Sequence, residues 1–109
     1  MICDRWDVIV VPFPFSEKAA EKRRPALVLS NAAFNAAGHT VLAMITTRSH
    51  TPWPGDCTLD DYGEAGLPRP CLVRIKIFTL DNRVILRHLG CLGATDRAHV
   101  GANLTTHLS

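Results

Sequence analysis

Short apolar runs broken by proline, glycine and polar residues are the feature of this sequence that most restricts its fold. Residues 7–12, 26–30 and 40–46 are aliphatic or β-branched and too short for ordinary helices, so each predicts a strand. Residues 26–29 and 41–45 have no polar break, which is typical of strands covered on both faces.

The second half of the chain predicts a β-hairpin. Residues 72–78 alternate between an aliphatic face and a face that carries Arg74 and Lys76. A turn signal at residues 81–82 leads into a partner strand over residues 83–89.

A helix is expected at the C-terminal end. Thr95 is a suitable N-cap, and Val100, Leu104 and Leu108 recur every four residues along one apolar edge. With a further short strand at residues 57–59, the pattern predicts a mainly β (α+β) fold. It is a compact β-barrel of about six strands with a C-terminal helix, and residues 1–109 are enough for a single domain.

The four cysteines and the termini suggest a reduced compartment. No two cysteines form a C-x-x-C pair, no histidine lies at zinc-ligand spacing, and no run of about 18 apolar residues predicts a membrane span. The start of the chain is charged, at Asp4, Arg5 and Asp7, unlike a signal peptide. We therefore expect a cytoplasmic protein with free cysteines and without a metal or another cofactor.

A cluster of cations ends abruptly at Pro25. Five of the twelve Lys and Arg residues are Lys18, Lys22, Arg23, Arg24 and Arg48. Proline disfavours helical geometry in the residue before it, so we expect the charged loop to stop where the strand over residues 26–30 begins. An arginine at the edge of a buried strand suits an oxyanion or a phosphate, although this stretch taken alone favours a solvated loop residue for Arg24.

Common catalytic signatures are missing. The sequence has no phosphate-binding glycine loop, no H-E-x-x-H and no G-x-S-x-G, and its five histidines are scattered. Arg24 and the hydroxyl groups at the ends of the second and third predicted strands remain as candidates.

Nearly the whole chain resembles one family. The motifs DVIVVPFPF (7–15), K-x-RPALVLSN (22–31), AMIT (43–46), AGL (65–67) and VR-x-KI-x-TL (73–80) occur in the order found in the MazF/PemK toxins of bacterial type II toxin–antitoxin systems. The resemblance implies an SH3-like barrel, usually a homodimer, that cuts single-stranded RNA without a metal. It also implies a cognate antitoxin, usually acidic, that occupies the same groove.

The resemblance assigns the catalytic pair to Arg24 and Thr46. A ribose 2′-hydroxyl would attack the adjacent phosphate, and Arg24 would hold the charged phosphoryl oxygens and supply a proton to the leaving 5′-oxygen. Thr46 would donate a hydrogen bond to the same phosphate, because its pKa is far too high for a general base. A strand-end threonine bonded to the backbone is the alternative for Thr46.

Further residues are expected to hold RNA. Lys18, Lys22, Arg23 and Arg48 would contact phosphates. Trp53 would either stack on an unpaired base or pack against the barrel or a dimer partner. Arg74 and Lys76 would line the same groove or form a solvated strand face.

Two departures from the family pattern affect this prediction. Trp6 occupies a position where the family commonly has glycine. Lys76 stands where one PemK-type branch has a catalytic aspartate, so the general base is open, and a non-catalytic RNA- or protein-binding barrel is an alternative. A CcdB-like gyrase poison is disfavoured, because the C-terminal residues 105–109 lack the Trp-Gly-Ile ending of those toxins.

Overall fold

The structure, a computed structural model, describes residues 1–12, 23–47 and 51–109. The strands of these residues are β1 (Asp7–Pro12), β2 (Arg23–Val28), β3 (His39–Thr46), β4 (Cys57–Thr58), β5 (Leu72–Asp81) and β6 (Arg87–Cys91). They form one antiparallel sheet in the order β4-β5-β3-β2-β1-β6. The short helix α1 (Ala32–Asn35) follows β2, and α2 (Ala94–Leu108) ends the chain.

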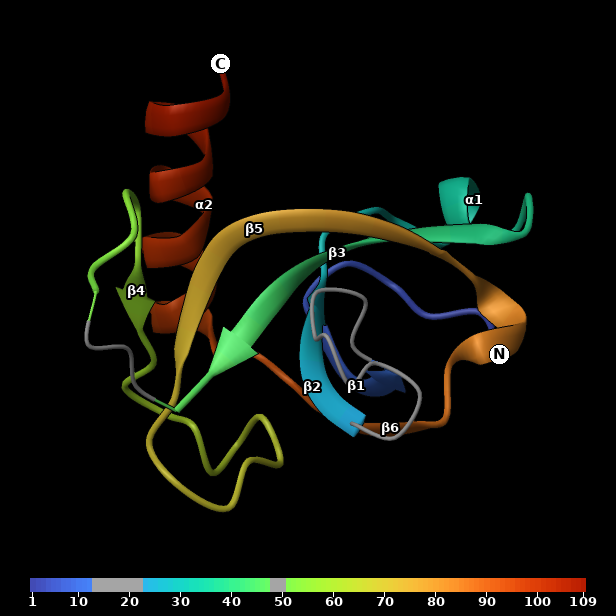
Figure 1. The fold of residues 1–109 in the computed structure, drawn as a ribbon, viewed down its shortest axis with the longest axis horizontal. Coiled ribbons are helices and arrows are strands. Elements are labelled where there is room, and N and C mark those ends of the chain that lie inside the picture. The colour runs from blue at the N-terminus through green and yellow to red at the C-terminus, as the bar shows by residue number, and fades with distance from the viewer. Residues whose placement is uncertain (13–22, 48–50) are drawn as a thin grey trace.

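The sheet curls strongly, so that β5 arches over the other strands while α2 stands beside β4 and one end of β5 (Figure 1). This arrangement confirms the expected mainly β fold of about six strands with a C-terminal helix. Within the described part of the chain, no helix combines the length and the apolar character that a membrane crossing requires.

Apolar side chains are buried on both sides of the sheet. In β1, Val8 packs in a cluster that includes Val100 of α2, whereas the next residue, Ile9, packs in a second cluster with Ala26 and Leu42. Successive residues of a strand point to opposite faces, so a strand buried on both sides needs an unbroken apolar run. The prediction of doubly covered central strands is therefore confirmed.

The second strand begins earlier than predicted. The strand β2 already includes Arg23, Arg24 and Pro25, which lie opposite residues 10–12 of β1. These three residues therefore do not form the loop that was predicted to precede the strand. Pairing between β2 and β3 reaches only to Ala26. Pro25 therefore lies where β2 has a paired strand on one side, and a proline without an N–H is tolerated at such a position.

The predicted hairpin after β5 is wrong. A 3₁₀ turn, η2 (Asn82–Val84), follows β5, and the chain then crosses to the far end of the sheet, where β6 pairs with β1. β3 pairs with β5 along most of its length, and β4 pairs with Leu72 and Val73 at its start. β6 joins the sheet at β1, on the opposite edge from β4.

The start of α2 also differs from the prediction. Gly93, not Thr95, is the N-cap residue, and it has no side chain that could accept a hydrogen bond. Asp96 in the first turn is fully buried and accepts hydrogen bonds from the backbone N–H groups of Asp60 and Asp61, each at 2.9 Å. The Asp96 side chain therefore connects the chain after β4 to α2.

Candidate functional site

Arg24 and Thr46 lie at the same end of the antiparallel strands β2 and β3. In the register of these strands, Ala26 faces Met44 and Val28 faces Leu42. Arg24 and Thr46 each lie two residues beyond the last paired positions, so both belong to the first row of side chains past the end of this ladder. Side chains two residues apart in a strand share a face of the sheet, so both belong to the face that carries Ala26 and Leu42.

The two neighbouring strands extend this row. Arg24 is paired with Val11 of β1, and Thr46 is paired with Leu72 of β5. Both Arg24 and Thr46 are half-buried. The row therefore contains one guanidinium and one hydroxyl group next to apolar side chains, where electrostatic interactions are stronger than in bulk water.

Arg74 belongs to the same face of β5, one row further along, opposite Met44. Its guanidinium donates from Nε to Asp56 Oδ1 at 3.0 Å and from Nη2 to Asp56 Oδ2 at 2.8 Å. A third bond runs from Nη2 to the Thr51 carbonyl oxygen at 3.3 Å. Only 11% of the Arg74 side chain and 19% of the Asp56 side chain is exposed, so this position is not a solvated strand face.

Trp53 lies against the same strand. Its indole Nε1 donates to the Ile75 carbonyl oxygen at 2.9 Å, and its ring centre is 5.8 Å from the Arg74 guanidinium and 5.6 Å from the Lys76 ammonium. Both distances are within the range of cation–π attraction. The residue is 39% exposed. Trp53 is thus packed on the barrel and still offers ring surface to solvent. Trp53, Asp56, Arg74 and Lys76 are called the Trp53 cluster below.

The Asp56 carboxylate is held in its charged form. Partial burial by itself would raise its pKa, but the hydrogen bonds from Arg74 and from the Trp53 backbone N–H, together with the charge of Arg74, outweigh burial and lower the pKa. The same contact raises the pKa of Arg74. A carboxylate with a lowered pKa and both oxygens engaged is a poor proton acceptor.

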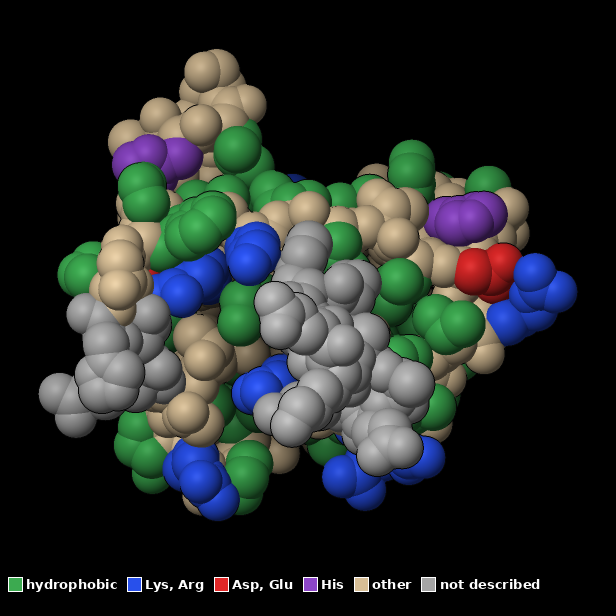
Figure 2. Space-filling model, viewed as in Figure 1, with side chains coloured by type: hydrophobic (Ala, Val, Ile, Leu, Met, Phe, Trp, Pro, Cys, Tyr) green, Lys and Arg blue, Asp and Glu red, His purple; other side chains and the backbone are tan. Residues whose placement is uncertain are grey.

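Positive charge is spread around these residues. Figure 2 shows Lys and Arg side chains over the face that carries the Arg23 end of β2 and the Thr46 end of β3, whereas most acidic side chains visible there lie near one edge. Arg23 is exposed. Three other predicted phosphate contacts, Lys18, Lys22 and Arg48, lie outside the described residues.

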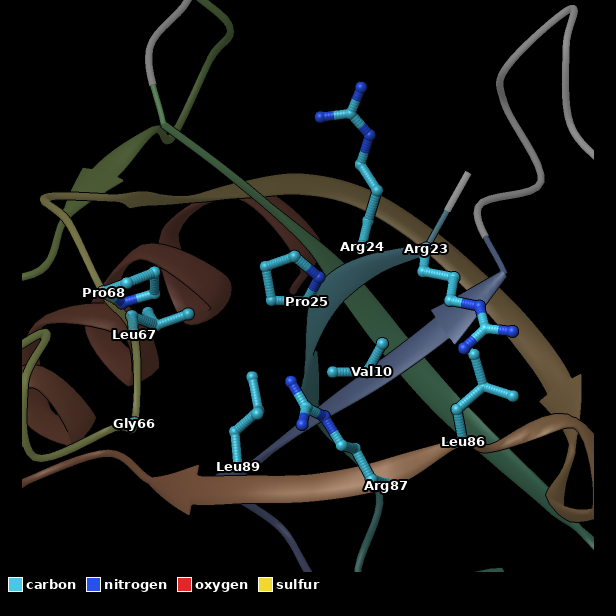
Figure 3. Close-up of a pocket in the computed structure, with 10 residues that line it drawn as sticks. All are labelled: Val10, Arg23, Arg24, Pro25, Gly66, Leu67, Pro68, Leu86, Arg87 and Leu89. Atoms are coloured by element: carbon cyan, nitrogen blue, oxygen red, sulfur yellow. The ribbon is translucent and has the colours of Figure 1, made fainter. Parts of the chain in front are cut away.

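A hollow of about 620 Å³ opens beside β2, on the other face of the sheet. Its lining includes Pro25, Leu67, Leu89 and three arginines, Arg23, Arg24 and Arg87. Arg87 extends from β6 over this hollow, whereas the guanidinium of Arg24 points away from Pro25 (Figure 3). Arg24 therefore borders the hollow as well as the face of the sheet that carries Thr46.

Sequence reasoning missed Asp56 and Arg87. Asp56 is 18 positions from Arg74, and no periodicity links a loop residue to a strand at that separation. Arg87 belongs to a strand whose predicted partner was wrong. The proline-flanked Trp53 was the one local signal for the loop that carries Asp56.

Possible metal ligands were also sought among the described residues. Asp60, Asp96 and His99 have one ligand atom each within 4.8 Å of one another. Both Asp96 oxygens already accept backbone hydrogen bonds, so the cluster is explained by the attachment of α2. The four cysteines, all within the described residues, are free thiols, as expected.

Comparison with known proteins identifies close similarity to one group. A family model described as "PemK-like, MazF-like toxin of type II toxin-antitoxin system" matches residues 4–108. Comparison with curated proteins finds no match.

Solved structures agree with the family match. MazF from Deinococcus radiodurans is 28% identical, with 99% of this chain and 97% of that chain covered and a TM-score of 0.76. A MazE–MazF structure from the same organism is 27% identical, with the same coverage and TM-score. A mycobacterial endoribonuclease in complex with its cognate antitoxin shares the fold at 21% identity, with 97% and 94% covered and a TM-score of 0.76.

The family match covers almost the whole chain, and the fold agrees over nearly its full length. The conformation of Trp6 fits this relationship, because its φ of 78° lies in the left-handed region where glycine, the common residue of the family at this position, is favoured. This chain therefore belongs to the PemK-like, MazF-like toxins of type II toxin–antitoxin systems.

Proposed function

We propose that this protein is a toxin endoribonuclease that cleaves single-stranded RNA without a metal ion. The observation that carries the proposal is that Arg24 and Thr46, 22 positions apart in the sequence, lie at the same end of β2 and β3, each two residues past the paired positions Ala26 and Met44. Both match the residues that the family resemblance assigns to the catalytic pair. Membership of the toxin family and similarity to solved MazF structures support it further.

The reaction needs charge stabilisation more than it needs a strong base. The ribose 2′-oxygen forms a bond to phosphorus, the bond from phosphorus to the 5′-oxygen breaks, and a 2′,3′-cyclic phosphate and a 5′-hydroxyl result. Arg24 neutralises the phosphoryl oxygens as a planar, permanently charged donor, and Thr46 donates a hydrogen bond to the same group. The proton of the 2′-hydroxyl passes to water, and the 5′-oxygen takes a proton from Arg24, which regains one from solvent.

The proton acceptor is water in this proposal. Lys76 replaces the aspartate of the PemK-type branch, and it lies over the Trp53 ring. Asp56, the carboxylate of the Trp53 cluster, is paired with Arg74 and has a lowered pKa, which makes it a weak base. Solvent can accept the 2′ proton while Arg24 and Thr46 lower the barrier electrostatically.

RNA is held by a basic surface with one aromatic platform. Arg23 and Lys76 contribute charge among the described residues, and Lys18, Lys22 and Arg48 are proposed to add phosphate contacts. Trp53 stacks on an unpaired base. Arg74 borders the groove, and its pairing with Asp56 leaves less net charge for a phosphate.

The family and the solved neighbours also suggest partners. MazE–MazF structures from Deinococcus radiodurans contain the antitoxin, and we propose that this chain, as a homodimer in the cytoplasm, binds a cognate antitoxin through an acidic segment. Such a segment would compete with RNA for the basic face.

The test is cleavage of a long single-stranded RNA with and without EDTA. We expect discrete cuts that survive EDTA and leave 2′,3′-cyclic phosphate ends detectable by mass spectrometry. Arg24→Ala should abolish them, and Thr46→Val should slow them about 10- to 1000-fold, by analogy with a lost oxyanion donor.

Two controls separate chemistry from folding and charge. Thr46→Ser keeps the hydroxyl and should cut at nearly the wild-type rate. Arg83→Ala removes an equal charge at an arginine whose side chain is 89% exposed, and it should leave the rate unchanged. Full activity of a folded Arg24→Ala variant would overturn the assignment, and a folded wild-type protein without cleavage would favour the non-catalytic binding barrel.

A further inference from the structure

Asp56 has more contacts than a loop aspartate needs. One carboxylate accepts Nε and Nη2 of Arg74, and Oδ2 also accepts the backbone N–H of Trp53 at 3.0 Å. The backbone N–H of Asp56 donates in return to the Trp53 carbonyl oxygen at 3.0 Å. Asp56 therefore closes the turn that carries Trp53 and connects this turn to Arg74 near the start of β5.

These contacts fix the indole from three directions. The turn is held by Asp56, the indole Nε1 is bound to the Ile75 carbonyl, and the ring lies beside the cations of Arg74 and Lys76. The residue is nevertheless 39% exposed. A tryptophan needed only for packing gains nothing from exposed ring surface, whereas a stacking surface needs both exposure and a fixed orientation.

We propose that Asp56 is a positioning residue that acts through Arg74 and the Trp53 backbone to hold the indole as a preformed stacking platform for one RNA base. The inference deepens the proposed function and rests on it. Asp56 itself does not touch RNA. Its contribution is preorganisation. The loop and the ring are already ordered before RNA binds, so the entropic cost of ordering them does not reduce the affinity for RNA.

Because Asp56 is charged, this role can be tested by the direction in which RNA affinity changes when the charge is removed. An aspartate beside an RNA groove repels phosphates, so its neutralisation should by charge alone strengthen RNA binding. A positioning role predicts the opposite, because Asp56→Asn replaces one carboxylate oxygen by an NH₂ group that cannot accept from Arg74. The two explanations therefore predict opposite changes in affinity.

The first measurement is the affinity for a 2′-O-methylated single-stranded oligonucleotide of mixed sequence, which has no 2′-hydroxyl and cannot be cleaved. We expect Asp56→Asn to weaken binding by roughly 5- to 150-fold, the range for loss of one base-stacking contact. Asp61→Asn, which removes the same charge from an exposed turn residue, should bind equally or more tightly.

A double-mutant cycle with Trp53→Leu identifies the residue through which Asp56 acts. In the Trp53→Leu background, Asp56→Asn should no longer weaken binding, and only the small gain from lost repulsion should remain. The slope of log affinity against log salt should stay close to that of wild type in Asp56→Asn, since stacking releases no counterions.

Fluorescence gives a readout that does not depend on RNA. The chain has two tryptophans, so Trp6→Phe leaves Trp53 as the only one. Addition of Asp56→Asn should increase quenching by acrylamide and lower the anisotropy of Trp53. Arg74→Lys, which keeps the charge and loses the bidentate contact, should do the same and provides a second variant if Asp56→Asn folds poorly.

The outcomes separate the two proposals. The positioning role would be overturned if Asp56→Asn bound the oligonucleotide as tightly as wild type or more tightly. It would also be overturned if Asp56→Asn weakened binding by the same factor in the Trp53→Leu background as in wild type. Either result would leave the ribonuclease proposal standing. A folded wild-type protein that binds no single-stranded oligonucleotide would overturn RNA recognition, and the positioning role with it.

Discussion

At the scale of single residues, the ion pair of Asp56 and Arg74 dominates the candidate site. The two side chains meet through two hydrogen bonds of 2.8 and 3.0 Å, and each is largely shielded from solvent. Removal of one partner from such a pair leaves the other charge poorly solvated, which is more costly than the net value of the pair.

Asp56→Asn is expected to lower the free energy of unfolding by about 3 kcal/mol near neutral pH, the lower end of the range for buried pairs. Because the folded-state pKa of Asp56 is lowered below 3.8, the carboxylate stabilises the fold above the unfolded-state pKa. This stabilisation is lost as pH falls through the folded-state pKa. Urea unfolding of both proteins between pH 7 and pH 2 measures the difference.

The comparison variant is Asp81→Asn. Arg83 holds the pKa of Asp81 at about 2, but this pair is exposed, and Asn can still accept the Arg83 backbone N–H. We expect little change in stability at pH 7. If the difference in free energy of unfolding between wild type and Asp56→Asn stayed constant down to pH 2, the charge of Asp56 would not be the cause of that difference.

At the scale of elements, Gly66 joins the chain after β4 to β6. Its φ of 78° lies in the left-handed region, and a Cβ at this position would overlap the Leu89 carbonyl group. Backbone cannot move aside as a flexible side chain can, so the glycine is required by a close approach as well as by its dihedral angle.

Gly66→Ala should therefore destabilise the protein by at least about 2 kcal/mol, the combined effect of left-handed backbone and overpacking. Gly63→Ala in the same connection is the matched control, because nothing lies within 4 Å of a Cβ built there. Thermal unfolding of the two variants should show a lowered Tm for Gly66→Ala only. Equal Tm values would mean that the connection can shift away from β6.

At the scale of the whole molecule, the curled sheet divides the cysteines by accessibility. Cys3, Cys57 and Cys71 are buried, and Cys91 is exposed. Burial raises the pKa of the three buried thiols, which keeps them protonated and unreactive at neutral pH.

Iodoacetamide at pH 7.5 should modify Cys91 quickly in the native protein and the buried cysteines only on unfolding. Peptide mass spectrometry of native and guanidinium-treated samples measures this difference. Fast native labelling of Cys57 or Cys71 would show that the region between β4 and β5 opens readily.

The sequence by itself determined features that depend on local pattern. The predicted alternation over residues 72–78 was only partly right, since Arg74 is buried, Ile77 is exposed and the pairing register with β3 shifts between them. The bounds of β1 were predicted as residues 7–12, and the half-buried Leu104 and buried Val100 confirm the inner part of the helix edge. These features are readable because burial on one face imposes a period of two in strands and close to four in helices. The resemblance to the toxin family added the alignment of Arg24 and Thr46 with a known site.

Only the tertiary structure decided the pairings between distant segments. β6 follows β5 in the sequence but pairs with β1 at the opposite edge of the sheet from β4, and Pro25 lies within β2 where the ladder to β3 ends beside it. Asp56 reaches Arg74 through the same kind of long-range contact, since Trp53 and Asp56, shortly before β4, lie against β5. Such contacts depend on which sheet edges and polar groups remain unsatisfied once the strands have assembled, and no local sequence period encodes this.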